Sequence, residues 1–411
     1  FKTTDGGQTW IEANNGLLHH AVHRLVIDPT DHNTLFVGTG CVGLPDLEEG
    51  NIFKSTNAGE TWTQIINSPD HSIGPIVFDP NDLNTMYAAG YYSFYKSEDH
   101  GEKWDAIYPP GQSGHYEGAA YHFPYQIIVH PSIPNIIFMG TYSGGVLKSV
   151  NGGKNWIPSN GDKNKGFVIA HANAVSVFPS DPNIMYAATI GGPFKTTNGG
   201  ETWQPLKEEQ HDYSVNRGIK VDPVDPNIVY FGGLNSFVRA DGDNLDLFLD
   251  GSANDPDQKS GNELSPQFID LLFKRSNHNI IYTAFLTETD LAPQYDGFYR
   301  FDFSDPNNPS WEKRNNGLTN KRIHALAMDK NTNTIYAGTE YGAASRSGGQ
   351  GRSKIAVSGG GPGSLFKTTN EGQSWQMVNE DLSFITAYKL VVPENNQNHI
   401  YAATNGHGVY F

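Results

Sequence analysis

The fold is decided by a short stretch near the start of the chain, TTDGGQTW at residues 3–10. Its pattern, Ser/Thr-x-Asp/Asn-x-Gly-x-x-Trp, returns at residues 55–62, 97–104, 149–156, 196–203 and 368–375. All seven tryptophans of the chain close this unit or a degenerate copy of it. Such a recurring unit predicts one supersecondary structure that is repeated along the whole chain.

Each part of the unit has a structural role. The Asp or Asn tolerates turn conformations and the Gly supplies a positive φ, so the middle predicts a tight turn. Apolar pairs such as Ile52-Phe53 and Leu365-Phe366 precede the turn, which predicts flanking strands. We expect the Ser/Thr hydroxyl and the Asp/Asn side chain to hydrogen-bond turn amides, and the indole to pack between neighbouring units.

The octet resembles the Asp-box, or BNR repeat, of sialidases, sortilin-type receptors, xyloglucanase-type glycoside hydrolases and photosystem II assembly factors. In those families the box marks a β-propeller and lies away from the active site. The resemblance therefore implies a fold and no particular activity. Sialidases also need an arginine cluster and a Tyr–Glu pair, and the arginines of this sequence show no such motif.

A second repeated element precedes each box. It consists of an apolar strand, a turn around Asp-Pro or a substitute, and a strand that ends in Tyr or Phe before small residues, as in residues 25–36. Its copies begin at residues 25, 76, 128, 175, 219, 271, 326 and 390, and two of the boxes, at 239–246 and 305–311, are degenerate. Each unit predicts a four-stranded antiparallel blade. The sequence therefore predicts an all-β, eight-bladed β-propeller; a seven-bladed ring is the alternative, with residues 239–246 as an excursion.

The two ends of the chain are complementary. Residues 408–411 align with residues 50–53, and Phe1-Lys2 aligns with Phe53-Lys54. We expect the C-terminal segment to supply the first three strands of a blade and the N-terminal segment the fourth, which closes the ring without a bare sheet edge. This predicts a single propeller domain over residues 1–411. Because Phe1 stands in the middle of a strand, we expect the N-terminal end to be truncated or processed.

Composition limits the classes of partner. The formal net charge is −16 with a pI near 5.3, which argues against nucleic acid and anionic membrane surfaces. No apolar run is long enough to span a membrane. The single cysteine, Cys41, excludes an internal disulfide and a multi-cysteine metal site. We expect an exported protein, located outside the cell, at its surface or in the periplasm.

Strand alternation sorts the loops onto two faces. Turns between the first and second strands and between the third and fourth are short, whereas the connections on the opposite face, the top face, are long. They include residues 39–51, 285–296 and 340–363, together with the inter-blade loops 105–122 and 244–266. Loops on a rigid scaffold usually carry the binding residues, so the top face is the candidate site.

A set of histidines falls at one repeat position near this face. It comprises His20, His71, His122 and His171. Imidazoles at the mouth of a central channel could bind a transition metal or serve acid–base chemistry on an acidic polysaccharide. The alternative is that they are polar caps at loop-to-strand junctions. The sequence requires no cofactor.

Aromatic and acidic side chains on the same face give two further sets of candidates. Aromatic rings that could stack on sugars, or else fill gaps between blades, are Tyr92, Tyr116, Tyr121, Tyr142, Tyr213 and Tyr341. Carboxylates that could serve as the acid and base of glycoside hydrolysis, or else remain solvated, are Asp46, Glu48, Glu288 and Asp290. Xyloglucanase-type enzymes place a catalytic Asp in each of two propellers, whereas this chain has one.

The sequence therefore favours a binding or scaffold propeller whose top-face loops engage a glycan or a protein, alone or as part of a larger assembly. The alternative is a glycan-degrading enzyme, a glycoside hydrolase or a metal-assisted lyase, with its site on the same face.

Overall fold

The computed structural model describes residues 1–17, 22–40, 50–67, 73–90, 93–107, 124–141, 144–159, 172–178, 180–189, 191–206, 218–233, 236–242, 244–250, 266–287, 296–305, 308–340, 364–378, 386–393 and 399–404. Within these ranges the chain forms β-strands and turns, and no helix. The chain divides into two compact units, called here the N-terminal unit (Asn14–Asp250) and the C-terminal unit (Gly251–Phe411 with Phe1–Ala13).

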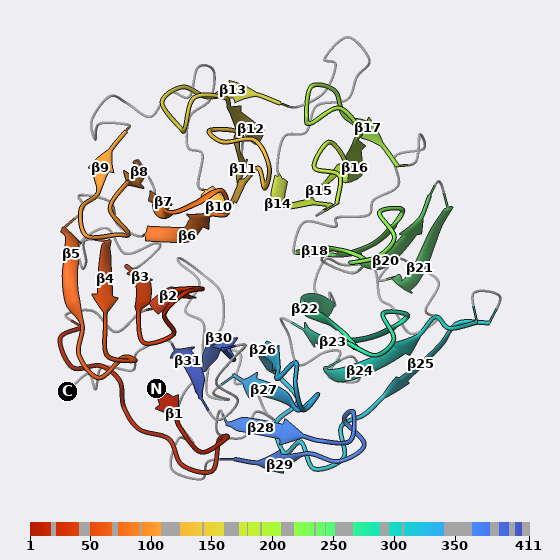
Figure 1. Ribbon diagram of the computed structural model, residues 1–411. Coiled ribbons are helices and arrows are strands. Elements are labelled where there is room, and N and C mark those ends of the chain that lie inside the picture. The colour runs from red at the N-terminus through yellow and green to blue at the C-terminus, as the bar shows by residue number, and fades with distance from the viewer. Residues whose placement is uncertain are drawn as a thin grey trace, which may run out of the picture. The chain divides into compact units, whose positions relative to one another are not determined.

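The N-terminal unit contains five four-stranded antiparallel sheets, numbered here as blades 1 to 5. In each blade the strands pair in chain order. Figure 1 shows these blades following one another along an arc, with the first strand of each on the inner side and the last on the outer side. The strands are β2 (Val22–Ile27), β3 (Leu35–Thr39), β4 (Asn51–Ser55) and β5 (Thr63–Asn67) in blade 1; β6 (Ile73–Asp79), β7 (Asp82–Gly90), β8 (Phe94–Ser97) and β9 (Asp105–Ala106) in blade 2; β10 (Pro124–Val129), β11 (Ile137–Thr141), β12 (Gly145–Ser149) and β13 (Ile157–Pro158) in blade 3; β14 (Ala172–Val177), β15 (Met185–Thr189), β16 (Gly192–Thr196) and β17 (Gln204–Pro205) in blade 4; and β18 (Gly218–Val221), β19 (Ile228–Gly232), β20 (Ser236–Asp241) and β21 (Asn244–Asp250) in blade 5.

The C-terminal unit contains two four-stranded antiparallel sheets, blades 6 and 7, and one three-stranded antiparallel sheet, blade 8. The strands are β22 (Pro266–Phe273), β23 (Ile280–Thr287), β24 (Gly297–Asp302) and β25 (Ser310–Lys313) in blade 6; β26 (Ile323–Met328), β27 (Ile335–Thr339), β28 (Leu365–Thr368) and β29 (Gln376–Met377) in blade 7; and β30 (Ala387–Val391), β31 (Ile400–Thr404) and β1 (Lys2–Thr3) in blade 8.

The eight sheets confirm the predicted fold class, an all-β, eight-bladed β-propeller. The seven-bladed alternative is wrong, because residues 239–246 belong to a complete blade in which Arg239 pairs directly with Asp246. The degenerate box lacks its tryptophan but keeps a glycine, Gly242, whose φ of 60° closes the hairpin.

The two ends of the chain share blade 8, as predicted, but the division of strands differs from the prediction. Lys2 pairs with Tyr401 of β31, so the N-terminal segment supplies the third strand rather than the fourth. The reason is the Phe1-Lys2 pair, which matches Phe53-Lys54 of the third strand β4. Ile11 then bridges Lys2 on the outer side. Residues 408–411, which we expected to form the third strand, lie outside the described residues.

The repeated box forms the predicted turn. Thr3 Oγ1 donates a hydrogen bond to Asp5 Oδ1 (2.7 Å) and accepts one from Gly7 N (3.0 Å), while Asp5 Oδ1 accepts another from Thr9 N (2.9 Å). Hydrogen bonds from Thr3 and Thr9 hold the pKa of Asp5 well below its usual value. Equivalent bonds close the turns that begin at Ser55, Ser97, Ser149, Thr196 and Thr368.

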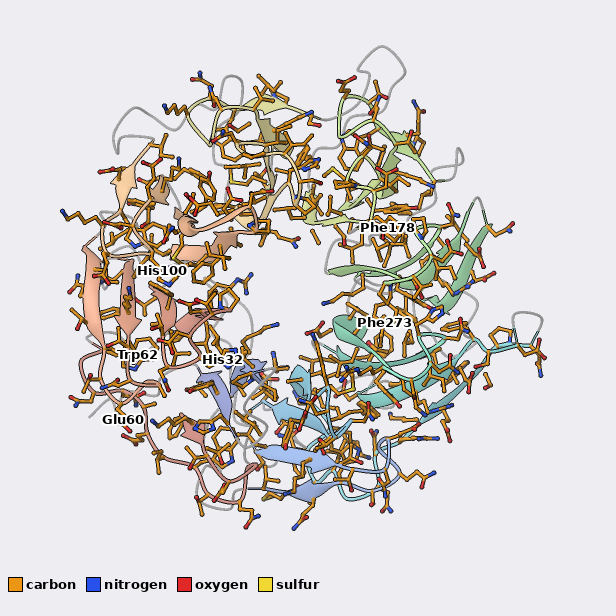
Figure 2. All side chains as sticks on the ribbon, viewed as in Figure 1. His32, Glu60, Trp62, His100, Phe178 and Phe273 are labelled. Carbon is orange, nitrogen blue, oxygen red and sulfur yellow. The ribbon has the colours of Figure 1, made fainter. Side chains whose placement is uncertain are left out.

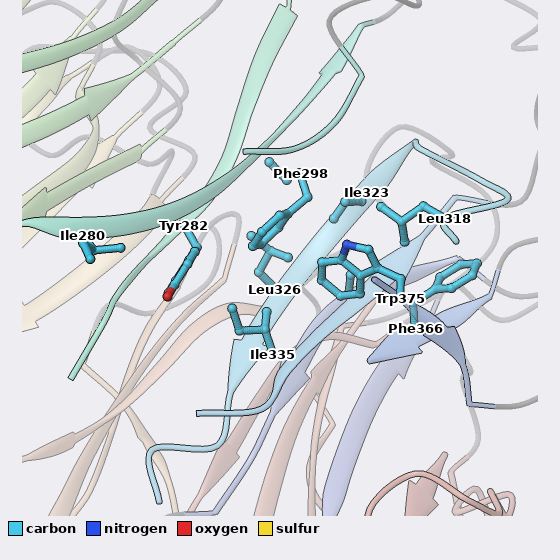
Figure 3. Close-up of a cluster of buried hydrophobic side chains, with 11 residues drawn as sticks. Ile280, Tyr282, Phe298, Leu318, Ile323, Leu326, Ile335, Phe366 and Trp375 are labelled. Atoms are coloured by element: carbon cyan, nitrogen blue, oxygen red, sulfur yellow. The ribbon is translucent and has the colours of Figure 1, made fainter. Parts of the chain in front are cut away.

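Tryptophans of complete boxes pack between neighbouring blades, as predicted. Figure 3 shows Trp375 of blade 7 in a buried cluster with Phe298 of blade 6, and the two ring centroids lie 4.9 Å apart at 77°. Trp156 of blade 3 packs in the same way on Phe94 of blade 2, at 5.0 Å and 73°. Trp311, in a degenerate box, is 52% exposed and stacks on Phe301 of its own blade.

A basic residue on each third strand lies opposite an aromatic residue of the second strand. The pairs are Phe36–Lys54, Tyr87–Lys96, Phe138–Lys148, Tyr186–Lys195, Tyr230–Arg239, Tyr282–Arg300, Tyr336–Lys367 and Tyr401–Lys2. Lys54 Nζ lies 5.2 Å from the Phe36 ring centroid and donates a hydrogen bond to the carbonyl of His100 in the box of the next blade (3.0 Å). The basic residue thus joins its own blade to the following one.

Candidate functional site

The top face can be located separately in each unit from the ends of the second strands. In blade 7, β27 ends at Thr339 and β28 begins at Leu365, so both ends of the loop 340–363 meet at this face. In blades 1 and 3 the same edge carries the ends of β3 and β11 and the starts of β4 and β12.

A buried threonine clamps the base of the loop at this edge. Thr141 Oγ1 donates to Gly145 O (3.0 Å) and accepts from Gly144 N (3.0 Å). Thr339 Oγ1 does the same with Ser364, donating to its carbonyl (3.1 Å) and accepting from its amide (2.9 Å). Thr189 donates to Gly192 O (2.7 Å) and Thr39 to Asn51 O (3.4 Å), and all four threonines have an exposed fraction of 1% or less.

Blades 1, 3, 4 and 7 share the clamp, while the loop that it closes differs in length among them. The two residues that it joins are 4 positions apart in blade 3 and 3 in blade 4, but 12 in blade 1 and 25 in blade 7. Satisfying the polar groups at the loop base lets the chain vary in length there without disturbing the blade. Loops of different length thus start from similar bases in these four blades.

An ionic cluster lies beside the longest of these loops. Arg322, just before β26, donates from Nε to Glu340 Oε2 (2.7 Å), and its guanidinium also lies 3.8 Å from Asp296 Oδ2, just before β24. His324 Nε2 is 3.4 Å from the same Glu340 oxygen. The side chains of all four residues are at most 14% exposed.

Backbone hydrogen bonds fix the cluster in place. Glu340 N donates to Arg322 O (2.7 Å), and Asn320 Nδ2 donates to Glu340 O (2.6 Å). Asn320 Oδ1 in turn accepts from Arg322 N (2.9 Å). Backbone and side-chain hydrogen bonds therefore both connect the end of β27 to the start of β26.

The charges of the cluster determine the ionisation state of Glu340. Burial disfavours the ionised form of Glu340, but His324 and Arg322 outweigh burial and lower the pKa of this carboxyl to about 2. A glycosidase acid needs a raised pKa so that it is protonated at working pH. Every carboxyl group in the described ranges whose pKa is displaced has it displaced downward. Glu340 therefore acts as a fixed anion that orders the loop base.

The residues predicted from sequence as site residues lie outside the described residues. They are His20, His71, His122 and His171; Tyr92, Tyr116, Tyr121, Tyr142, Tyr213 and Tyr341; and Asp46, Glu48, Glu288 and Asp290. Their roles stay predictions. In the described ranges no group of three or more His, Cys, Asp or Glu residues could hold a metal ion. No helix among those residues could span a membrane.

Sequence reasoning missed the two features that shape the described part of this face. The threonine clamp has a signal, because Thr39, Thr141, Thr189 and Thr339 each stand three positions after the buried Tyr or Phe of the second strand. The cluster has no such signal, since Arg322 and Glu340 do not recur at equivalent positions in the other units.

Comparisons with known proteins agree with the fold and leave the activity open. No protein-family model matches the chain. A probable oligoxyloglucan-reducing end-specific xyloglucanase of Neosartorya fischeri is 29% identical over 125 residues, which are 29% of this chain and 13% of the relative's length. The chain therefore matches only a small part of that relative.

Two solved structures are similar in fold. Sqt1 of Saccharomyces cerevisiae has a TM-score of 0.59 at 10% identity and covers 95% of this chain and 98% of its own. YCF48 bound to D1 peptide has a TM-score of 0.47 at 12% identity and covers 95% of this chain and 96% of its own. The chain is thus similar to a segment of a xyloglucanase in sequence, and to Sqt1 in fold.

Proposed function

We propose that the protein is an extracytoplasmic binding propeller whose top-face loops engage a glycan or a protein partner. The observation that carries the proposal is the threonine clamp of blades 1, 3, 4 and 7, from which loops of very different length begin. In blade 7 the ionic cluster adds a second, charged anchor beside the longest loop. An arrangement of this kind supports recognition by loops, with the blades as an invariant frame.

Electrostatics favours binding over catalysis in the described part of the face. Glu340 is paired with Arg322 and kept ionised, so it cannot deliver a proton to a leaving group. The net charge of −16 directs the proposal toward neutral glycans or basic protein surfaces. The aromatic residues Tyr92, Tyr116, Tyr121, Tyr142, Tyr213 and Tyr341 are the proposed contacts with such a partner.

A loop replacement tests this proposal. In the variant, residues 341–363 are replaced by residues 143–144 from the corresponding loop of blade 3, so that Glu340 and its pairing with Arg322 are kept. A panel of soluble polysaccharides and protein extracts first identifies a ligand that the wild type binds. We expect the variant to keep its thermal stability and to lose binding to that ligand. A matched control carries Asn331→Ala, in the exposed turn between β26 and β27. Unchanged binding in the loop variant would overturn the assignment to this face.

The second candidate function is glycan degradation, supported by the sequence similarity to a xyloglucanase over 125 residues. Its proposed catalytic residues are Asp46, Glu48, Glu288 and Asp290, with His20, His71, His122 and His171 as ligands if a metal takes part. Release of reducing ends from xyloglucan, abolished by Asp46→Asn or Asp290→Asn and retained in Asn331→Ala, would establish this function in place of the first.

A further inference from the structure

Blade 3 carries three exposed aliphatic side chains. Ile133 is 47% exposed, Val150 60% and Ile157 57%. Ile133 lies in the turn after β10, Val150 in the box, and Ile157 at the start of β13. Single apolar residues are common on protein surfaces, whereas several that lie together are typical of a surface that binds a partner.

The three residues lie at the edge of blade 3 opposite to its threonine clamp, since their turns precede and follow the strands that the clamp joins at the other end. The turn after β10 contacts the box, because Gly152 N donates a hydrogen bond to Asn135 O (2.9 Å). Lys148 of β12 pairs with Ile157, and Val150 stands two positions after Lys148. The blade 3 patch is defined here as Ile133, Val150, Lys154 and Ile157.

Ile133 replaces a hydrogen-bond acceptor that other blades use to close this turn. It holds the same place as Asp31, because the carbonyl of each accepts from the amide three residues later. In five blades a side-chain oxygen at this place also accepts from the amide two residues later, at 2.9–3.1 Å; the acceptors are Asp31, Asp82, Asp181, Asp225 and Asn277. Isoleucine cannot accept this bond, so blade 3 gives up a turn contact and exposes an apolar group. Such a departure from the local rules of a fold is typical of a functional position.

The box of blade 3 also has aliphatic residues where other boxes are polar. Val150 is the second residue of the box, and the other complete boxes have Thr4, Thr56, Glu98, Thr197 and Thr369 there. Ile157 follows the box tryptophan. At that position blade 8 also has an isoleucine, Ile11, but the remaining complete boxes are followed by Thr63, Asp105, Gln204 and Gln376.

The charge of blade 3 differs from that of the rest of the chain. Residues 124–158, from β10 to β13, contain no Asp or Glu, although the chain has 44 acidic residues and a net charge of −16. The charged side chains of this segment at neutral pH are Lys148 and Lys154. Blade 3 therefore lacks the carboxylates that would repel an acidic partner.

Lys154 replaces an acidic or amide side chain of the box. It is the sixth residue, and the other complete boxes have Gln8, Glu60, Glu102, Glu201 and Gln373 there. Figure 2 shows both Glu60 and Trp62 of the blade 1 box. Lys154 forms no ion pair within the described part of the chain, and the nearby Glu98 of blade 2 pairs with Lys96. The ammonium of Lys154 is thus available to a carboxylate from outside.

We propose that the blade 3 patch is a second interaction surface, which binds a short segment of a partner protein that carries apolar side chains and an acidic residue. The apolar side chains cover Ile133, Val150 and Ile157, and the acidic residue pairs with Lys154. This surface is separate from the top-face loops, so it goes beyond the proposed function.

The size of the patch decides between a short segment and a larger partner. Three side chains that are each about half exposed present at most a few hundred Å² of apolar surface. A standard protein interface takes about 800 Å² from each partner. A second copy of this chain would also bring its own net charge of −16 against the same charge. Area and charge therefore favour a short segment of another protein.

Selection from a peptide library tests the proposal with defined probes. Random linear peptides displayed on phage are selected on the wild type and counter-selected on a patch variant with Ile133→Asp, Val150→Thr, Lys154→Glu and Ile157→Gln. Each substitution introduces a residue that another blade has at that position, and Ile133→Asp supplies the missing acceptor, so we expect the variant to keep the wild-type Tm.

The enriched peptides should combine apolar residues with Asp or Glu. We expect their affinity to fall at least tenfold in the patch variant, and to weaken for the wild type as the salt concentration rises. Absence of any peptide that prefers the wild type to the variant, or enrichment of basic peptides, would overturn the proposal.

A transplant of the patch to blade 4 is the control for folding. Starting from the patch variant, Asp181→Ile, Thr197→Val, Glu201→Lys and Gln204→Ile rebuild the four positions there. Asp181 and Glu201 are the acidic residues of segment 172–205, so the rebuilt blade also lacks carboxylates. The selected peptides should bind this protein again, and failure to recover binding would contradict the assignment to the patch.

Light scattering distinguishes a foreign partner from a second copy. We expect the wild type and the patch variant to have the same molar mass at all concentrations. A dimer of the wild type that the patch variant does not form would overturn the proposed segment and make a second copy of the chain the occupant.

Discussion

At the scale of single residues, the described edge of the top face of blade 7 is built from polar groups that pair with one another. Thr339 is fully buried and exchanges two hydrogen bonds with Ser364, and Glu340 next to it is neutralised by Arg322. Buried polar groups are costly when a partner is removed and nearly neutral when all are paired. Small changes at these positions should therefore have measurable effects on stability.

Thr339→Val keeps the shape of the side chain but removes the hydroxyl. The amide and carbonyl of Ser364 then lose a buried partner, and we expect the free energy of unfolding to fall by about 1–3 kcal/mol. Urea denaturation measures this change. Thr339→Ser keeps the hydroxyl and should cost about 1 kcal/mol, through the lost methyl group. Equal losses in the two variants would show that the clamp adds nothing to stability.

Glu340 predicts a specific acid response. Its pKa is lowered to about 2, below the unfolded value of about 4.3, so the stability that it contributes is present above that value. This stability is lost as the pH falls through the window between the two values. We expect Glu340→Gln to be less stable than wild type at neutral pH and to approach it near pH 2. A difference that stays constant across acid pH would contradict the pairing with Arg322.

At the scale of elements, each blade is a set of antiparallel strands, and the tryptophans of complete boxes such as Trp156 and Trp375 pack on the preceding blade. Trp375 is 6% exposed and packs on Phe298 of the preceding blade, while Trp311 is 52% exposed and stacks within its own blade. The two tryptophans offer a matched comparison inside one unit.

Trp375→Ala opens the seam between blades 6 and 7. Removal of a buried aromatic side chain typically costs about 3–5 kcal/mol, and we expect a loss in that range by denaturant unfolding. Trp311→Ala removes an exposed ring and should cost less than about 1 kcal/mol. Similar losses for both would mean that seams do not depend on the box tryptophan.

Much of the structure of the blades could be predicted from the sequence. The boxes predicted their turns because Ser/Thr, Asp/Asn and Gly each have one conformational role there, as the bonds around Thr3 and Asp5 confirm. The order of strands in blade 8 was predicted wrongly, because Phe1-Lys2 was assigned to the fourth strand although it carries the Phe–Lys pair of a third. The cluster of Arg322, Glu340 and Asp296 joins residues from two blades, and no local pattern records such a contact. The histidine, tyrosine and carboxylate candidates lie outside the described residues.

At the scale of the whole molecule, the chain forms eight regular blades, and the loops between second and third strands differ in length from blade to blade. A binding propeller needs only this combination, whereas a glycosidase also needs a protonated acid opposite an ionised carboxylate. The proposed function therefore predicts recognition without turnover.

The most direct test of that claim is size-exclusion chromatography with light scattering, applied to xyloglucan after prolonged incubation with stoichiometric protein. We expect the polymer to keep its full length; co-elution with the protein would identify a glycan partner, and separate elution would direct the search to a protein partner. Shortened polymer, absent after incubation with an Asp46→Asn and Asp290→Asn variant, would contradict recognition without turnover and make the protein an enzyme.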